Sequence, residues 1–246
     1  MSFQQALLEL IHGAKTVKEQ TNTTTVHSHN GTNPLERVMI EIQLEDYDHV
    51  AFDLDGTLVD SQAVVESALR RWALEERICP DYAMRMSAGR RDVELVEAIA
   101  PGLSPKREAA RIAVYEIQAM RLLQPIQGAA EFYSSIPVEG RSIVTSSTRV
   151  SALARLEAAG IARPRIMIAA EDVRQGKPHP QPYQTLLRML HIPPERCLVF
   201  EDTRTGIESA TAAGCDCVGV GPSASGHTDT KGWIENFRAV LSNRPS

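Results

Sequence analysis

Two aspartates, Asp53 and Asp55, stand two residues apart in the segment FDLDGTL. They directly follow a short apolar run that predicts a buried strand. Capping of a helix would account for one aspartate, but Gly56 indicates a tight turn rather than a helix start. One carboxylate of such a pair can attack an electrophile while the other moves a proton. Thr57 adds a hydroxyl beside them.

A second acidic pair, Glu201 and Asp202, follows another apolar run, residues 197–200. If both runs are strands of one parallel sheet, the four acids meet at one edge. Each pair of like charges 4 Å apart costs about 4 kcal/mol at an effective dielectric near 20. A cluster of this kind requires a cation, and an all-oxygen ligand set favours a hard ion such as Mg²⁺.

Two further segments suit a phosphate group. Lys177 lies in the segment QGKP, where the proline stiffens the chain and suits a lysine held in place. Thr145 and Ser146 follow a third apolar run, where hydroxyls and free backbone amides could bind a phosphate oxygen. Serine and threonine also favour ordinary helix caps, and both interpretations stay open at this point.

The elements that position these residues alternate along the chain. Helical patterns cover residues 150–159 and 206–213, each followed by a capping glycine. Between such patterns, apolar runs predict strands at 49–53, 142–145, 166–170, 197–200 and 217–220. This alternation predicts an α/β fold with a Rossmann-like parallel sheet covered on both faces. Ligands bind such sheets at the carboxyl ends of the strands.

Residues 61–126 interrupt the alternation, because their apolar stripes have helical spacing throughout. We therefore predict an inserted α-helical cap at 61–126, whose third helix begins after Ser104 and runs to about Leu123. The catalytic core then comprises residues 47–60 and 127–246. Residues 1–46 form an N-terminal extension, partly loop, whose pattern allows a short amphipathic helix near its start.

Bulk properties exclude several classes of protein. The formal charge of -5 over 246 residues gives no basic excess for nucleic acid. No apolar run approaches the roughly 18 residues that cross a bilayer, and the first residues do not resemble a secretory signal. The four cysteines match no zinc or redox spacing, which predicts reduced thiols in the cytoplasm. The pair His27 and His29 lacks a further ligand nearby and is not assigned to a metal site.

Taken in order, the four segments resemble the motifs of the haloacid dehalogenase superfamily over about residues 48–222. The resemblance implies that Asp53 is a nucleophile forming an aspartyl-phosphate and that Asp55 is the general acid and base. It implies that Thr145 and Lys177 hold the phosphoryl oxygens. Mg²⁺ would be bound by four residues: Asp53, the backbone carbonyl of Asp55, Asp202, and Glu201 directly or through water.

Differences between branches of the superfamily indicate which branch this chain resembles. Dehalogenases lack the second aspartate, which this chain has as Asp55. Phosphonatases need a cap lysine, and residues 61–103 contain none. The helical insertion resembles the cap of the phosphoglucomutase-like subfamily, and the motifs resemble its sugar and polyol phosphatases, namely the 2-deoxyglucose-6-phosphatase and glycerol-3-phosphatase group.

We expect residues of both the cap and the catalytic core to contact the substrate. Arg90 and Arg91 belong to a segment resembling the cap loop of that group, although they could also be the solvated start of a helix. Substrate-binding residues are predicted to be Thr57, Arg90, Arg91, Ser146 and Arg149.

We therefore expect an Mg²⁺-dependent phosphatase acting on a small sugar or polyol phosphate, with no nucleic-acid or membrane partner. A sugar-phosphate mutase resembling β-phosphoglucomutase would use the same core residues and is the main alternative. A non-catalytic binding module is a further alternative, which loss of a core residue would favour, and none is lost. The sequence indicates neither the physiological substrate nor the oligomeric state.

Overall fold

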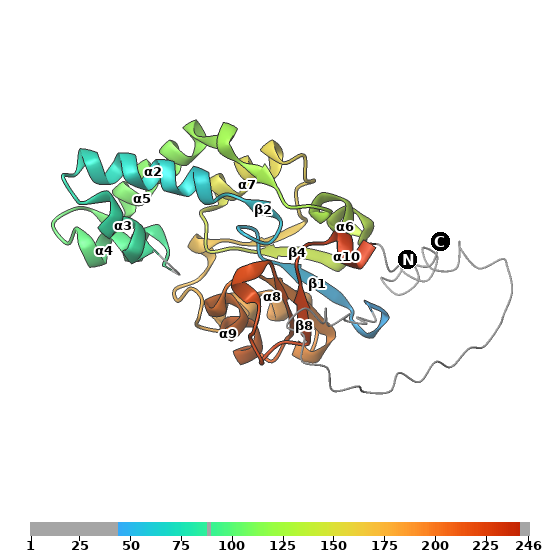
Figure 1. Cartoon of the computed structure of the whole chain (residues 1–246). Helices are drawn as coiled ribbons and strands as arrows, with labels where there is room; N and C mark the ends of the chain where they lie inside the picture. The colour runs from blue at the N-terminus through green and yellow to red at the C-terminus, as the bar shows by residue number, and fades with distance from the viewer. Residues whose placement is uncertain (1–43, 88–89, 242–246) are drawn as a thin grey trace, which may run out of the picture.

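The computed structural model describes residues 44–87 and 90–241. Its main sheet has six parallel strands in the order β5-β4-β1-β6-β7-β8 (Figure 1). The strands are β1 (His49–Phe52), β4 (Arg141–Val144), β5 (Ile166–Ile168), β6 (Cys197–Glu201), β7 (Asp216–Val220) and β8 (Gly232–Ile234). The predicted α/β class with a parallel sheet is therefore confirmed.

The first strand lies in the middle of the sheet, between β4 and β6. All four of its residues are buried, because helices cover both of its faces. Phe52 is level with Ile143 of β4 and with Phe200 of β6. The residues that follow these three strands therefore meet at one edge of the sheet.

Each face of the sheet packs against its own helices, as Figure 1 shows. One face carries α6 (Ala129–Ser135), α7 (Arg149–Ala158) and α10 (Arg238–Leu241) over an aromatic cluster of Phe52, Phe132, Phe200 and Phe237. The other face carries α8 (Gln181–Leu190) and α9 (Arg204–Ala212). Short 3-10 helices occur at Leu44–Asp46, Met120–Leu122, Val138–Gly140, Ala170–Asp172, Pro194–Arg196 and Pro222–Ala224.

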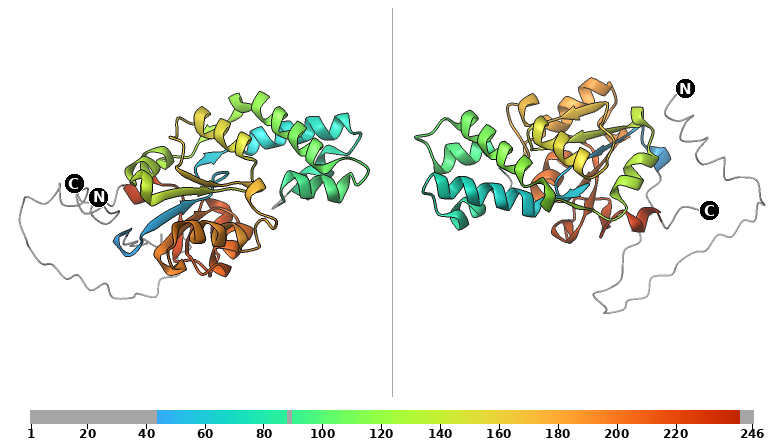
Figure 2. Two further views of the ribbon diagram at one scale, coloured as in Figure 1. Left: turned by 180° about the vertical axis from the view of Figure 1, so that it is seen from behind. Right: turned by 90° about the horizontal axis from the view of Figure 1, so that it is seen from above.

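Four of the α-helices between β1 and β4 form a separate lobe beside the sheet (Figure 2). They are α2 (Gln62–Glu75), α3 (Pro80–Ser87), α4 (Asp92–Ile99) and α5 (Pro105–Gln118), and we call them the helical insertion. The insertion has its own apolar core, centred on Leu69, Trp72, Leu95 and Ile112. The Trp72 indole also donates to the buried Glu108 carboxylate at 3.1 Å.

The prediction that residues 61–126 contain helices alone is wrong. Two short antiparallel strands, β2 (Val59–Asp60) and β3 (Gln124–Pro125), pair where the chain enters and leaves the insertion. Two residues are too few to show a strand period in the sequence. The third helix of the insertion also ends at Gln118, followed by a 3-10 turn, rather than near Leu123.

The expectations for the extension, including its helix and the His27 and His29 pair, fall on residues 1–43, which lie outside the described part of the chain. Among the described residues, the structure contains no helix that is both long and apolar enough to cross a membrane.

Candidate active site

Asp53 lies directly beyond the end of the central strand. Its backbone N–H donates to the Phe200 carbonyl at 2.9 Å, which fixes it against the neighbouring strand. The side chain is buried, and its Oδ1 accepts from the Lys177 ammonium at 2.5 Å. Burial and the nearby carboxylates raise the pKa of Asp53, while Lys177 opposes that rise. Further positive charge beside the predicted nucleophile would favour its ionised form.

Lys177 joins three segments of the core from the loop that precedes α8. Its ammonium donates to Asp53, to Glu201 Oε1 and, at 2.9 Å, to the carbonyl of Val144. Burial alone would lower the pKa of Lys177, but the two carboxylates outweigh burial and raise it. The lysine is thus held as a cation between the ends of β1, β4 and β6.

Glu201 is fully buried beneath this lysine. Its Oε1 accepts from Lys177 and from the Tyr183 hydroxyl at 2.8 Å, and its Oε2 accepts from Thr203 at 3.4 Å. A Cβ at Gly206 would lie 1.9 Å from Oε2, so the glycine in α9 makes room for this carboxylate. Tyr183 and Gly206 were not predicted from the sequence, because both belong to helices whose contact with β6 is tertiary.

Asp202 offers an oxygen with no partner. Its Oδ1 is buried and has no hydrogen bond among the described residues. Burial and then the charge of Glu201 raise the pKa of Asp202 to about 8, and Lys177 opposes them. A buried carboxylate oxygen without a donor is costly, and a bound cation would remove that cost.

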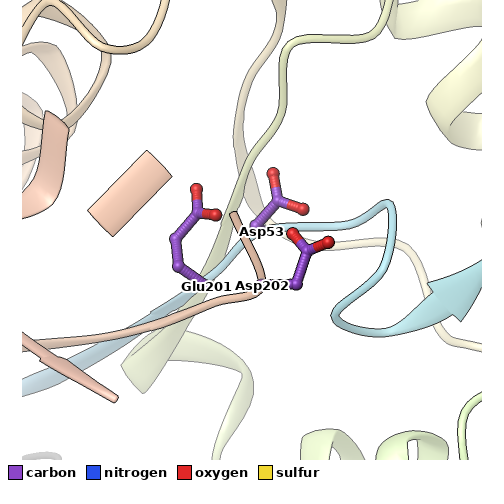
Figure 3. A group of neighbouring side chains, drawn as sticks. All are labelled: Asp53, Glu201 and Asp202. Carbon is purple, nitrogen blue, oxygen red and sulfur yellow. The ribbon is translucent and has the colours of Figure 1, made fainter. Parts of the chain in front are cut away.

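Three carboxylates at this edge could hold a metal ion. One oxygen each from Asp53, Glu201 and Asp202 all lie within 4.8 Å of one another. Figure 3 shows the three side chains close together, Glu201 at the end of β6 and Asp53 and Asp202 directly after β1 and β6. With the unpartnered oxygen of Asp202, this donor set fits a hard divalent cation.

Asp55 is held by donors on both of its carboxylate oxygens. Oδ1 accepts from the Ser61 hydroxyl at 2.5 Å. Oδ2 accepts from the Ser147 hydroxyl at 2.8 Å and from Arg155 Nη1 at 2.7 Å. The side chain is 25% exposed, so part of it stays accessible to solvent. The predicted acid and base is therefore oriented by residues from three segments of the chain.

Arg155 is a site residue that the sequence reasoning missed. It lies in α7, and its side chain is 1% exposed. Its position one residue before Leu156 and three after Ala152 places it on the buried face of the helix. An arginine on the apolar stripe of a helix was the available signal.

The other residues predicted to contact the phosphate differ in their burial and in their hydrogen-bond partners. Thr145 is buried, and its Oγ1 accepts from the backbone N–H of Ser147 at 3.0 Å. Thr57 is buried, and its Oγ1 has no partner among the described residues. Ser146 is exposed. The substrate contacts of these three residues stay predictions.

The predicted arginines lie in three different environments. Arg90 and Lys177 both line an open pocket of about 670 Å³ between the helical insertion and the loop that precedes α8. Arg91 instead donates to the carbonyls of Ala170, Val173 and Arg174 at 3.0–3.1 Å, which ties the helical insertion to the core. Arg149 bonds to Asp172 and to the Met167 carbonyl.

Comparison with known proteins identifies the class. Residues 50–220 match the family of haloacid dehalogenase-like hydrolases, and the chain belongs to this family. Hexitol phosphatase A of Escherichia coli (strain K12) is 33% identical over 178 residues, which cover 70% of this chain and 82% of the relative. Glycerol-1-phosphate phosphohydrolase 2 of Saccharomyces cerevisiae is 29% identical over 181 residues, covering 69% and 72%. The predicted family is therefore confirmed, and these relatives are named phosphatases.

Solved structures agree on the fold. CbbY from Rhodobacter sphaeroides, crystallised in complex with phosphate, superposes with a TM-score of 0.68 at 19% identity. The superposition covers 78% of this chain and 95% of that protein. At this identity the likeness shows the shared fold alone.

Proposed function

We propose that this chain hydrolyses a small sugar or polyol phosphate through an aspartyl-phosphate on Asp53, with Mg²⁺ as its cofactor. The observation that supports this most is the contact between the buried Asp53 carboxylate and Lys177 at 2.5 Å, beside the acids Glu201 and Asp202. A carboxylate, a fixed cation and a metal-binding set suit attack on a phosphate. The names of the two relatives support the substrate class.

The first half of the reaction transfers the phosphoryl group. The Asp53 carboxylate attacks phosphorus, the ester P–O bond breaks, and Asp55 in its acid form gives a proton to the leaving oxygen. Lys177 and the Thr145 hydroxyl would hold phosphoryl oxygens. Asp53 and Asp202, with the backbone carbonyl of Asp55, would bind Mg²⁺, which would supply positive charge against the phosphate. Glu201 would act through water, because donors already occupy both of its oxygens.

The second half returns the enzyme to its starting state. Asp55, now a carboxylate, removes a proton from water while the water oxygen attacks phosphorus. The bond between phosphorus and Asp53 breaks, and inorganic phosphate leaves with the Asp53 carboxylate restored. Both halves need Asp55 in one orientation, which Ser61, Ser147 and Arg155 support in this structure.

The two lobes would have different roles in the reaction. Residues 47–60 and 127–246 would form the catalytic core, and residues 61–126 the cap that closes over the substrate and excludes water. Arg90 in the open pocket would contact the substrate from the cap, with Thr57, Ser146 and Arg149 contributing from the core. The four cysteines are free thiols, which supports a reducing compartment such as the cytoplasm.

A screen of sugar and polyol phosphates with Mg²⁺, read by release of inorganic phosphate, tests the proposal. Asp53→Asn should lower turnover by at least ~10⁴, the scale of losing a covalent nucleophile. Acid-quenched wild-type enzyme should carry phosphate that is lost in Asp53→Asn. Retention of a tenth of the activity by this folded variant would overturn the mechanism. A hexose 1-phosphate converted to its 6-phosphate without free phosphate would show a mutase instead.

A further inference from the structure

Arg155 connects the proposed acid and base to the helical insertion. Through Nη1 it donates to Asp55 Oδ2 at 2.7 Å and to the Ser147 hydroxyl. Through Nη2 it donates to Glu116 Oε1 at 2.7 Å. Asp55 and Ser147 belong to the core, whereas Glu116 lies in α5 of the insertion. The Arg155 guanidinium thus bridges the two lobes and contacts Asp55, the proposed acid and base.

The surroundings of Arg155 hold more negative charge than it neutralises. Asp92, at the start of α4, is close enough to interact electrostatically with Glu116, Arg155 and Asp55. Burial and then Glu116 raise the pKa of Asp92 to about 7, which Arg155 opposes. Buried ion pairs add little net stability compared with apolar packing. A contribution to stability alone therefore does not account well for the presence of a buried arginine among these acids.

The geometry of Asp55 gives the arginine a second role. The Ser61 hydroxyl on Oδ1 comes from the segment that leads into the insertion, and Arg155 on Oδ2 comes from the helix that contacts α5. Both oxygens of Asp55 are thus tied to elements that join the lobes. Movement of α5 relative to the core would pull on Glu116 and Arg155 before it reached Asp55.

We propose that Arg155 is a positioning residue that orients Asp55 for proton transfer and, through Glu116, makes that orientation depend on the position of the helical insertion. This inference rests on the proposed phosphatase function. It assigns Arg155 no contact with the substrate, because its two terminal nitrogens donate to Asp55, Ser147 and Glu116.

The test separates the two halves of the reaction with p-nitrophenyl phosphate in Mg²⁺. p-Nitrophenolate is a good leaving group and needs no acid, whereas hydrolysis of the aspartyl-phosphate needs Asp55 as base. Arg155→Lys keeps the charge but cannot reach two acids with two nitrogens. We expect its burst of one p-nitrophenolate per enzyme to keep its rate within about twofold. The later steady rate should fall by about 10- to 100-fold, within the general contribution of proton transfer.

Two reference variants show whether the effect is specific to the contact between Arg155 and Asp55. Asp55→Asn should show the same burst and a still slower steady rate. Arg111→Lys perturbs another arginine that binds several carboxylates, but one whose partners Glu75, Glu76 and Glu108 all lie within the insertion. It should leave both phases unchanged within about twofold. An equal fall in both phases for Arg155→Lys, or no fall in either, would overturn the positioning role.

The link to the insertion has its own measurement. Glu116→Gln should slow the same steady phase, and Arg155→Lys/Glu116→Gln should be no slower than Arg155→Lys, because both changes break one connection. Additive losses would overturn the link. If Asp55→Asn shows a burst and Arg155→Lys behaves as wild type, this inference fails while the proposed function stands. If no variant forms a phosphoenzyme, the proposed function itself fails.

Discussion

Asp202 occupies the space beside Gly56 that the Cβ of any other residue would fill. A Cβ built at Gly56 would lie 2.0 Å from Asp202 Oδ2, and the glycine has a φ of +89°. The glycine after the two aspartates therefore does more than allow the turn. It lets the loop after β1 approach the acid after β6 closely, which brings together the acids that we propose bind Mg²⁺.

Gly56→Ala should therefore impair metal binding in addition to straining the turn. We expect the Mg²⁺ concentration for half-maximal activity to rise at least ~10-fold, because Asp202 must move away from its position. Gly160→Ala is the matched control, since Gly160 also has a positive φ of +66° but has nothing within 4 Å of the added Cβ. Both variants should lose about 1–2 kcal/mol of stability from the backbone conformation. An equal Mg²⁺ requirement in the two variants would contradict the role of this contact.

Removal of the metal gives a direct prediction for the acidic cluster. Excess chelator should abolish phosphate release and Mg²⁺ should restore it, because the clustered acids otherwise repel the substrate phosphate. Asp202→Ala should raise the Mg²⁺ requirement sharply. Glu208→Gln alters a partly exposed acid of α9 whose partner is Arg204, and it should leave the requirement unchanged. Full activity in excess chelator would show that the acidic cluster has a role other than binding the catalytic metal.

The parts of the site that could be predicted from the sequence are those carried by local motifs. Asp53, Lys177 and Asp202 each follow a strand or lie in a short characteristic loop, and the sheet order brings those loops together. The parallel sheet was predictable for the same reason, because the apolar runs and helical patterns alternate along the chain.

Residues whose roles arise from packing between lobes could not be placed in this way. The position of Arg155 on the apolar stripe of α7 predicts burial but not its partners, since Glu116 of α5 lies 39 residues away from it in the chain. The contacts of Arg91 with the core could not be predicted either, because its acceptors there are backbone carbonyls of the segment after β5. Backbone acceptors leave no signature in side-chain types.

Arg90 and Arg91 should differ when each is replaced by alanine. Arg90→Ala should lower activity on the best sugar or polyol phosphate by ~10 to 10³-fold and change p-nitrophenyl phosphate hydrolysis far less, since that substrate lacks the distal groups. Arg91→Ala should lower both activities alike, because it releases the loop that leads to Lys177. Loss of one charged hydrogen bond, about 1.5–3 kcal/mol, corresponds to about tenfold or more.

Both substrates must be measured on one preparation of each variant, with melting temperatures to exclude unfolding. Arg85→Ala, at an exposed position in α3, is the control and should leave both activities unchanged. A loss for Arg91→Ala confined to the sugar phosphate would show instead that Arg91 reads the substrate. No loss for Arg90→Ala on either substrate would place Arg90 outside the site.

Asp92 should make the stability of the protein depend on pH. Its pKa is raised from 3.8 to about 7 by burial and by Glu116, so the folded state holds this proton more tightly than the unfolded state does. Stability from this group is then full below about pH 4 and is lost as the pH rises through 7. Asp92→Asn imitates the neutral form and removes that loss. Its melting temperature should therefore exceed that of wild type more at pH 8 than at pH 5.

Thermal unfolding at both pH values, followed by circular dichroism, measures this difference. A change of about 1 kcal/mol should shift the melting temperature by about 2–4 °C in a protein of this size. Glu97→Gln changes an exposed acid in the same helix α4 and should give a difference from wild type that is the same at both pH values. A stabilisation by Asp92→Asn that is no larger at pH 8 than at pH 5 would mean that Asp92 is already ionised in the folded protein at both pH values, contrary to the balance of burial and charge described above.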